Sequence, residues 1–194
     1  MVARPLRFID RCAHGSRSAS ATPPDTERPA WAPLRRRLAV VTPDTAQAVR
    51  FAGGWLFDRV MDGWDVTVYR ADEDGDDRPL RIIGARAASL DKIMAPPPAA
   101  PPRALAVHTD IYNRDPRVRR MVFDALDESS TRVSLWGDLS AAGGDEGSCS
   151  VLYRLSAAAR AFKAQALAAA AVASDAEDPV ERFVHIEPLR FNTI

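Results

Sequence analysis

The chain has 194 residues and balances 26 basic against 26 acidic side chains, so its formal net charge is zero. This length fits one domain with a tail and excludes a large multidomain protein. No apolar run approaches the roughly 18 residues of a membrane span, and two cysteines are too few for a disulfide framework. Only Lys92 and Lys163 are lysines, an arginine bias typical of GC-rich bacterial genomes. We therefore expect a cytoplasmic bacterial protein.

The first 34 residues predict a flexible basic arm rich in proline and arginine. Residues 1–37 carry eight arginines against three acidic residues. Such a segment buries too little apolar surface to offset its chain entropy. The rest of the chain is acidic on balance, so the arm could dock on it or bind an anionic partner. A targeting segment or a misassigned start are the alternatives.

A strand–helix–strand pattern opens the folded domain, which we expect over residues 35–190. In chain order we expect a buried strand at 38–41, an amphipathic helix at about 43–61 and a half-buried strand at 64–69. Thr42 and Pro43 are residue types that begin helices. Gly53-Gly54 within the helix indicates close packing against a neighbouring element.

Five acidic residues surround Gly75 in the segment 72–77. A calcium-binding loop starts in a similar way, but position twelve, counted from Asp72, is Ile83 where such loops need a glutamate. We therefore expect a solvated turn. It would join strands at 66–69 and 80–83 in an antiparallel hairpin, with a short helix following within 85–94.

Residues 96–102 contain five prolines in seven positions, which enforces an extended segment. We interpret it as a crossover within one domain because a further strand follows; a linker or a site for proline-binding modules are the alternatives. We then expect a strand at 104–107, a helix from Asp115-Pro116, a strand at 132–136, a glycine-rich loop at 137–149, a long helix at 151–173 and an edge strand at 180–186.

These elements predict a three-layer α/β fold. Its sheet would have five to six strands, mainly parallel and possibly mixed, with helices on both faces. The pattern is Rossmann-like, but no G-x-G-x-x-G follows the first strand.

Polar residues at the carboxyl ends of the predicted strands are the candidate ligand-binding residues, because ligands bind at this edge of open parallel sheets. They are Thr42, Asp44, Thr45, Asp110 and Asp138. Helix amides there could hold an anion, and the carboxylates could bind magnesium. Capping residues occupy such positions in any α/β protein, so a purely structural role is the competing interpretation.

Motifs for specific chemistry are absent from the sequence. It contains no phosphate loop and no nucleophile elbow, and its three histidines lack zinc-ligand spacing, so we expect no metal and no cofactor. His108, close to Asp110, could act as a base, although a histidine at a strand end is more commonly only hydrogen-bonded. Cys149 would need a neighbouring histidine to act as a nucleophile.

Together these observations favour a non-enzymatic interaction or regulatory domain that acts through the arm or an exposed helix face. Its partner would be another protein or a second copy of the chain. The alternative is a small-molecule or phosphate-binding enzyme that uses the acidic and threonine residues at the strand ends. The acidic body argues against nucleic acid as a partner. Catalytic residues and substrate stay open.

Overall fold

Seven strands form one sheet in the computed structural model, which describes residues 36–95, 101–128, 130–138, 148–173 and 179–186. The strands are β1 (Arg37–Thr42), β2 (Asp65–Arg70), β3 (Arg86–Ser89), β4 (Ala104–His108), β5 (Arg132–Trp136), β6 (Ser148–Arg154) and β7 (Val180–Ile186). Their order across the sheet is β3-β2-β1-β4-β5-β7-β6. Strands β1 to β5 run parallel, whereas β7 is antiparallel to both β5 and β6.

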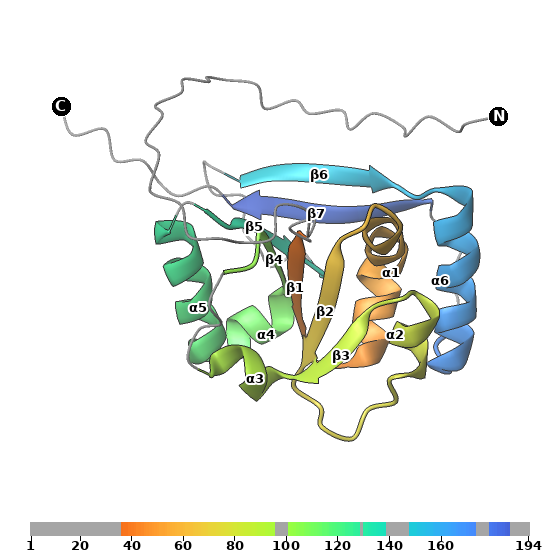
Figure 1. Ribbon diagram of the computed structural model, residues 1–194, viewed down its shortest axis with the longest axis horizontal. Coiled ribbons are helices and arrows are strands. Elements are labelled where there is room, and N and C mark those ends of the chain that lie inside the picture. The colour runs from red at the N-terminus through yellow and green to blue at the C-terminus, as the bar shows by residue number, and fades with distance from the viewer. Residues whose placement is uncertain (1–35, 96–100, 129, 139–147, 174–178, 187–194) are drawn as a thin grey trace, which may run out of the picture. The chain divides into compact units, whose positions relative to one another are not determined.

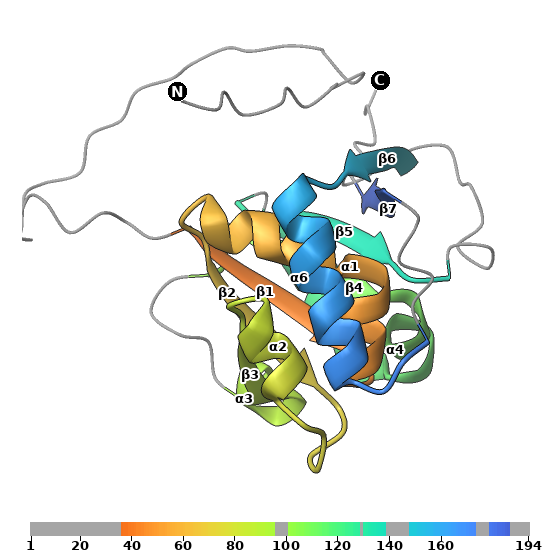
Figure 2. The ribbon, with the colours of Figure 1, turned by 90° about the vertical axis from the view of Figure 1, so that its right-hand side faces the viewer.

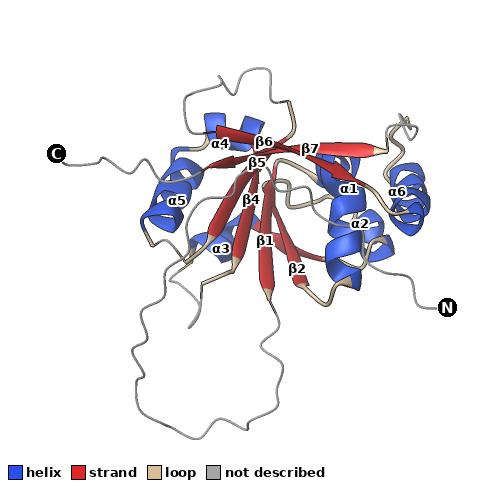
Figure 3. Cartoon of the chain, turned by 90° about the horizontal axis from the view of Figure 1, so that it is seen from above, coloured by secondary structure: helices blue, strands red, loops and turns tan. Residues whose placement is uncertain are grey.

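Helices cover both faces of this sheet (Figures 1 and 3). They are α1 (Thr45–Met61), α2 (Arg78–Ile82), α3 (Leu90–Met94), α4 (Thr109–Arg114), α5 (Pro116–Asp127) and α6 (Ala157–Ala169). Helices α1, α2 and α6 lie on one face, and Figure 2 shows that face toward the viewer. Helices α3, α4 and α5 lie on the other. The predicted three-layer α/β fold with a mixed sheet is confirmed, with seven strands rather than five or six.

The core divides between these two faces because side chains alternate along each strand. In β1, Leu38 and Val40 pack with α1 and α6, while Ala39 and Val41 pack with α4 and α5. All four are at most 5% exposed. A strand buried on both faces reads as a continuous apolar run, which is why the sequence reveals β1 clearly.

The predicted antiparallel hairpin is wrong. Residues 80–82 belong to α2 rather than to a strand, and β3 pairs in parallel with β2. Pro79 lies in the first turn of α2, and Leu80 and Ile83 are both fully buried. That spacing of three places them on one helical face. The short helix expected within 85–94 covers only residues 90–94, which form α3, because residues 86–89 form β3.

The predicted long helix at 151–173 is also wrong at its beginning. Residues up to Arg154 form β6, in which Val151 and Tyr153 are half-buried while Leu152 and Arg154 are exposed. Helix α6 begins after Ser156, whose hydroxyl accepts the amide of Ala159. The last strand, β7, lies inside the sheet and β6 forms its edge. Helix α4 was not predicted.

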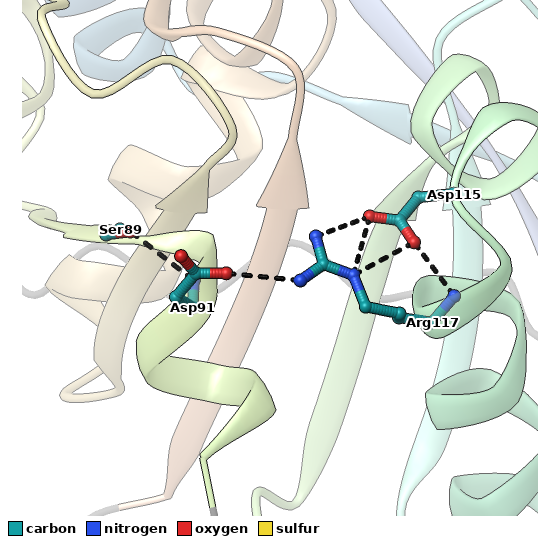
Figure 4. A network of polar contacts seen from close by, with 4 residues as sticks. All are labelled: Ser89, Asp91, Asp115 and Arg117. Atoms are coloured by element: carbon teal, nitrogen blue, oxygen red, sulfur yellow. Dashed lines mark hydrogen bonds and ion pairs between the residues drawn. The ribbon is translucent and has the colours of Figure 1, made fainter.

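An exposed polar network joins α3 to α5 (Figure 4). The guanidinium of Arg117 donates to the carboxylates of Asp115 and Asp91, and the amide of Asp91 donates to Ser89. Arg117 holds the pKa of Asp115 below its ordinary value. Exposed ion pairs contribute little to stability, so this network sets how the two helices begin rather than holding the layer together.

Three stretches discussed from the sequence lie outside the described residues: the basic arm at 1–34, positions 96–100 of the proline-rich segment and positions 139–147 of the glycine-rich loop. None of the helices in the described ranges has the length and hydropathy of a membrane span.

Candidate functional site

The carboxyl ends of β4 and β5 meet the first half of α1 at the side chain of His108. This residue ends β4, precedes α4 and is 1% exposed. Its ring centroid lies 4.7 Å from that of Trp136, which ends β5, and 5.8 Å from that of Phe51 in α1. The imidazole is therefore enclosed by aromatic rings from two elements.

Hydrogen bonding fixes how this imidazole carries its proton. The Nδ1 atom of His108 accepts the amide of Asp110 at 3.1 Å, so in the neutral ring the hydrogen is on Nε2. The buried Nε2 has no hydrogen-bond partner among the described residues. A Cβ added at Gly137 would lie 2.5 Å from it. Only a glycine lets the backbone after β5 pass the ring at this distance.

Three carboxylates act on His108 electrostatically. Burial lowers the pKa of His108, while the charges of Asp110, Asp44 and Asp138 partly oppose that shift. The imidazole is consequently neutral at pH 7, and it adds no positive charge to the acidic residues around it. We call Asp44, His108, Asp110 and Asp138 the rim cluster.

Three of the five predicted site residues therefore come together in the rim cluster. Asp44 caps α1, with its Oδ1 accepting the amide of Gln47 at 2.7 Å. The side chain of Asp110 is 42% exposed in the first turn of α4 and lies 4.0 Å from the guanidinium of Arg114. Asp138 is exposed, and its carbonyl accepts the hydroxyl of Thr109 at 3.0 Å.

The two predicted threonines are buried beneath this surface. The hydroxyl of Thr42 donates to the carbonyl of Asp44 at 2.9 Å, so Thr42 shapes the turn between β1 and α1. Thr45 is 6% exposed, and its hydroxyl has no partner within the described ranges. The cap of α1 is Asp44 and not, as the sequence suggested, Thr42.

Sequence reasoning missed Arg70, which ends β2 at the same edge of the sheet. Its guanidinium is buried and forms ion pairs with Asp77 at 2.8 Å and Asp72 at 3.6 Å. Gly75 lies beside it: a Cβ there would come within 2.2 Å of a guanidinium nitrogen of Arg70 and of a carboxylate oxygen of Asp72, so both side chains would have to shift. The acidic turn is thus organised by a buried cation. A single arginine at a strand end gave no signal in the sequence.

The acidic turn and the rim cluster interact through their charges. Burial raises the pKa of Asp72, and the charge of Asp44 raises it further. A separate open depression of about 540 Å³ lies beyond the turn, lined by residues of the turn, α2 and β3. No member of the rim cluster lines it, so we do not connect the two.

The rim cluster does not fit a metal ion. In the part of the chain that the structure describes, no group of three or more His, Cys, Asp or Glu residues could hold one. Within the cluster, Nδ1 of His108 is bound by an amide, its Nε2 faces Gly137, and Oδ1 of Asp44 caps α1.

Comparison with known proteins supports the fold. No family model and no curated protein sequence matches the chain. Among solved structures, a deacetylase of the teicoplanin biosynthesis pathway, in complex with teicoplanin, aligns with a TM-score of 0.56 and 17% identity, covering 78% of this chain and 98% of that one. The zinc-inhibited form of teicoplanin deacetylase gives 0.47 and 17%, covering 68% and 82%. The deacetylase of an antimicrobial pseudoaglycone gives 0.48 and 18%, covering 70% and 81%.

These neighbours correct the functional interpretation favoured from the sequence. A non-enzymatic interaction or regulatory domain is contradicted, because the solved protein that aligns with a TM-score of 0.56 is a deacetylase. The sequence pointed away from an enzyme because none of the familiar catalytic motifs is present. The alternative, an enzyme that uses the strand ends, agrees better with the comparison.

Proposed function

We propose that this protein is an enzyme that hydrolyses an acyl–nitrogen bond in a small molecule, with the rim cluster as its active site. The observation that carries the proposal is that Asp44, Asp110 and Asp138 follow the parallel strands β1, β4 and β5 at the edge where His108 ends β4, and that their charges act on its imidazole. This is the edge where open parallel sheets bind their ligands. The deacetylases that share the fold support the choice of reaction, although a fold alone never decides a function.

Asp110 is the residue we assign as general base. Its carboxylate is 42% exposed two positions after His108, and its backbone amide donates to Nδ1 of that ring. In the proposed reaction, water attacks the acyl carbon while Asp110 takes one of its protons. The carbon–oxygen bond forms, the carbon–nitrogen bond breaks, and the proton passes to the leaving nitrogen. The products are a carboxylic acid and an amine.

The charge of the cluster favours an amine product over an anionic ligand. Three carboxylates beside a neutral imidazole create a negative potential at this edge. An ammonium group is attracted by that potential and a phosphate is repelled. The phosphate-binding version of the enzyme hypothesis is therefore the weaker one.

The test compares Asp110→Asn with wild type on a panel of N-acetylated amines, amino sugars and amino acids. Released acetate and amine are both measured. We expect one substrate class to be hydrolysed and the variant to lose roughly 100-fold or more in kcat/KM, as for loss of a general base. Asp127→Asn is the matched control, because Asp127 is an exposed aspartate at the C-terminal end of α5 and is not a member of the rim cluster. Equal rates in Asp110→Asn and wild type, or no hydrolysis across the panel, contradict the proposal.

A further inference from the structure

Helix α1 changes direction partway along its length. Figure 2 shows its first half (orange) and second half (gold) running along different directions. Gly53 and Gly54, the pair of glycines that interrupts the apolar pattern, lie in the middle of α1. Abrupt bends in helices have local causes, such as glycine pairs or a side chain inserted into the hydrogen-bond ladder.

Both causes are present at this bend. The amide of Gly54 donates to one carboxylate oxygen of Glu181 at 3.0 Å, and the amide of Trp55 donates to the other at 2.8 Å. In a regular helix interior these amides would point along the axis at carbonyls four residues earlier. Two successive amides can turn to a side chain of another element only where the ladder is opened.

The carboxylate that fills this opening is almost fully buried. Glu181 belongs to β7 and is 2% exposed, and the ammonium of Lys163 in α6 lies 2.7 Å from its Oε1. Burial raises the pKa of Glu181, while Lys163 and the two amides oppose that rise. A charge this deep is retained only where partners compensate it, and here α1 and α6 supply them.

The first half of α1 reaches the rim cluster, so its direction matters for the site. It begins at the cap residue Asp44 and carries Phe51, whose ring contacts His108. The second half is tied elsewhere: Asp58 accepts the hydroxyls of Ser156 at 2.7 Å and Tyr153 at 3.1 Å. Glu181 holds the joint between the two halves.

We propose that Glu181 is a positioning residue of the rim cluster, which it orients by binding the amides of Gly54 and Trp55. Without Glu181, α1 can straighten, and the amides of Gly54 and Trp55 can then donate to helix carbonyls four residues earlier. Phe51 would then move away from His108 and leave that imidazole more hydrated. The inference rests on the proposed function only in treating the rim cluster as a site, since the positioning is measurable without a substrate.

The test is an NMR titration of His108 in the full-length protein and in Glu181→Ala. The strongest charges on His108 are Asp110, Asp44, Arg114 and Asp138, and Glu181 is not among them. A change in the variant therefore reports movement of the ring's surroundings. We expect the pKa of His108 to rise toward the ordinary value of about 6.5. Amide exchange at Gly54 and Trp55, followed in the same samples, reports whether the opening has closed.

Asp58→Ala is the matched control, because it removes the other acidic anchor of α1, which is half-buried, without touching the bend. It should leave the pKa of His108 unchanged. An unchanged pKa in both variants, or an equal rise in both, overturns the proposal. Should Glu181→Ala fail to fold, Glu181→Gln keeps the shape and one acceptor oxygen. It should shift the pKa of His108 in the same direction by a smaller amount, and no shift would again overturn the proposal.

Failure here is separable from failure of the proposed function. If the pKa of His108 shifts in Glu181→Ala but no substrate class is hydrolysed, the positioning role of Glu181 stands and the enzyme assignment fails. If a substrate is hydrolysed but the pKa of His108 does not shift, the enzyme assignment stands and the positioning role of Glu181 fails.

Discussion

The backbone of Gly137 runs beside the imidazole of His108 at a distance that no other residue allows. Gly137 has φ +105°, in the region that favours glycine, and a Cβ there would lie 2.5 Å from Nε2. Each of these two facts would select glycine independently. The loop after β5 and the histidine that ends β4 are therefore fitted to each other.

Gly137→Ala should consequently destabilise the protein more than an ordinary glycine replacement. We expect a loss of about 2–3 kcal/mol in the free energy of unfolding, from backbone strain plus the contact with His108. Gly63→Ala is the control: Gly63 has φ +81° and no atom within 4 Å of the added Cβ. It should lose only about 1 kcal/mol. Urea unfolding measures both, and equal losses would mean that the His108 contact costs nothing.

The burial of His108 predicts a pH dependence of stability. Because burial lowers the pKa of His108, the unfolded chain binds a proton more readily than the folded one. The stability is thus complete above about pH 6.5 and falls as the pH drops below that value toward the folded pKa. Thermal unfolding between pH 8 and pH 5 should show this fall in wild type. It should be smaller in His108→Gln, and identical slopes would contradict the assignment.

Gly54 and Gly53 should respond differently to alanine. A Cβ at Gly54 would lie 2.6 Å from both δ-carbons of the buried Leu155, whereas one at Gly53 would meet its nearest atom at 3.3 Å. We expect Gly54→Ala to cost about 1–3 kcal/mol by overpacking. Gly53→Ala should be near neutral, since helix propensity offsets a milder contact. Denaturant midpoints of the two variants check this, and the reverse order would show that Leu155 yields easily.

Replacing Arg70 should unfold the acidic turn locally. Arg70→Met leaves Asp72 and Asp77 without their cation, at the end of β2. Breaking a buried pair costs about 3–5 kcal/mol, and because both aspartates are partly exposed we expect the lower end of that range. Arg81→Met, an exposed neighbour in α2, is the control and should change stability little. A loss below about 1 kcal/mol for Arg70→Met would place the pair among ordinary surface contacts.

The same turn should not respond to calcium. Two of its five acidic side chains are paired with Arg70, and the glutamate that closes a calcium loop is absent from the sequence. We expect millimolar calcium to leave the Tm of wild type unchanged. A rise in Tm that EDTA reverses would show a cation site at this turn.

Much of the sheet follows from the sequence because β1, β4 and β5 are short apolar runs bounded by capping residues. The errors fall where a short apolar segment is compatible with both a helix and a strand. Residues 80–83 contain three apolar positions in four, and only the preceding Pro79 marks a helix start. Val151 and Leu155 fit a helical face, yet antiparallel pairing with β7 makes the first of them part of β6. Such a pairing partner lies about thirty residues away and is invisible to local patterns.

The candidate site was predictable in outline only. Parallel strands end at one edge, which is why the sequence predicts that Asp44, Asp110 and Asp138 lie at the same edge of the sheet. Their centre, His108, is defined by Gly137, Phe51 and Trp136, contacts that depend on three-dimensional packing. Arg70 was missed because a single arginine at a strand end carries no pattern. Glu181 was missed because its partners lie in α1 and α6, far from it in sequence.

The place of β7 in the sheet has a consequence for how the chain is made. β7 comes last among the described elements, yet it lies between β5 and β6 and supplies the carboxylate at the bend of α1. During synthesis β6 has no neighbour to pair with until residues 180–186 have left the ribosome. Until then β6 lacks the strand with which it pairs, and the amides of Gly54 and Trp55 lack the carboxylate of Glu181. Unpaired strand edges of this kind make a nascent chain prone to aggregation.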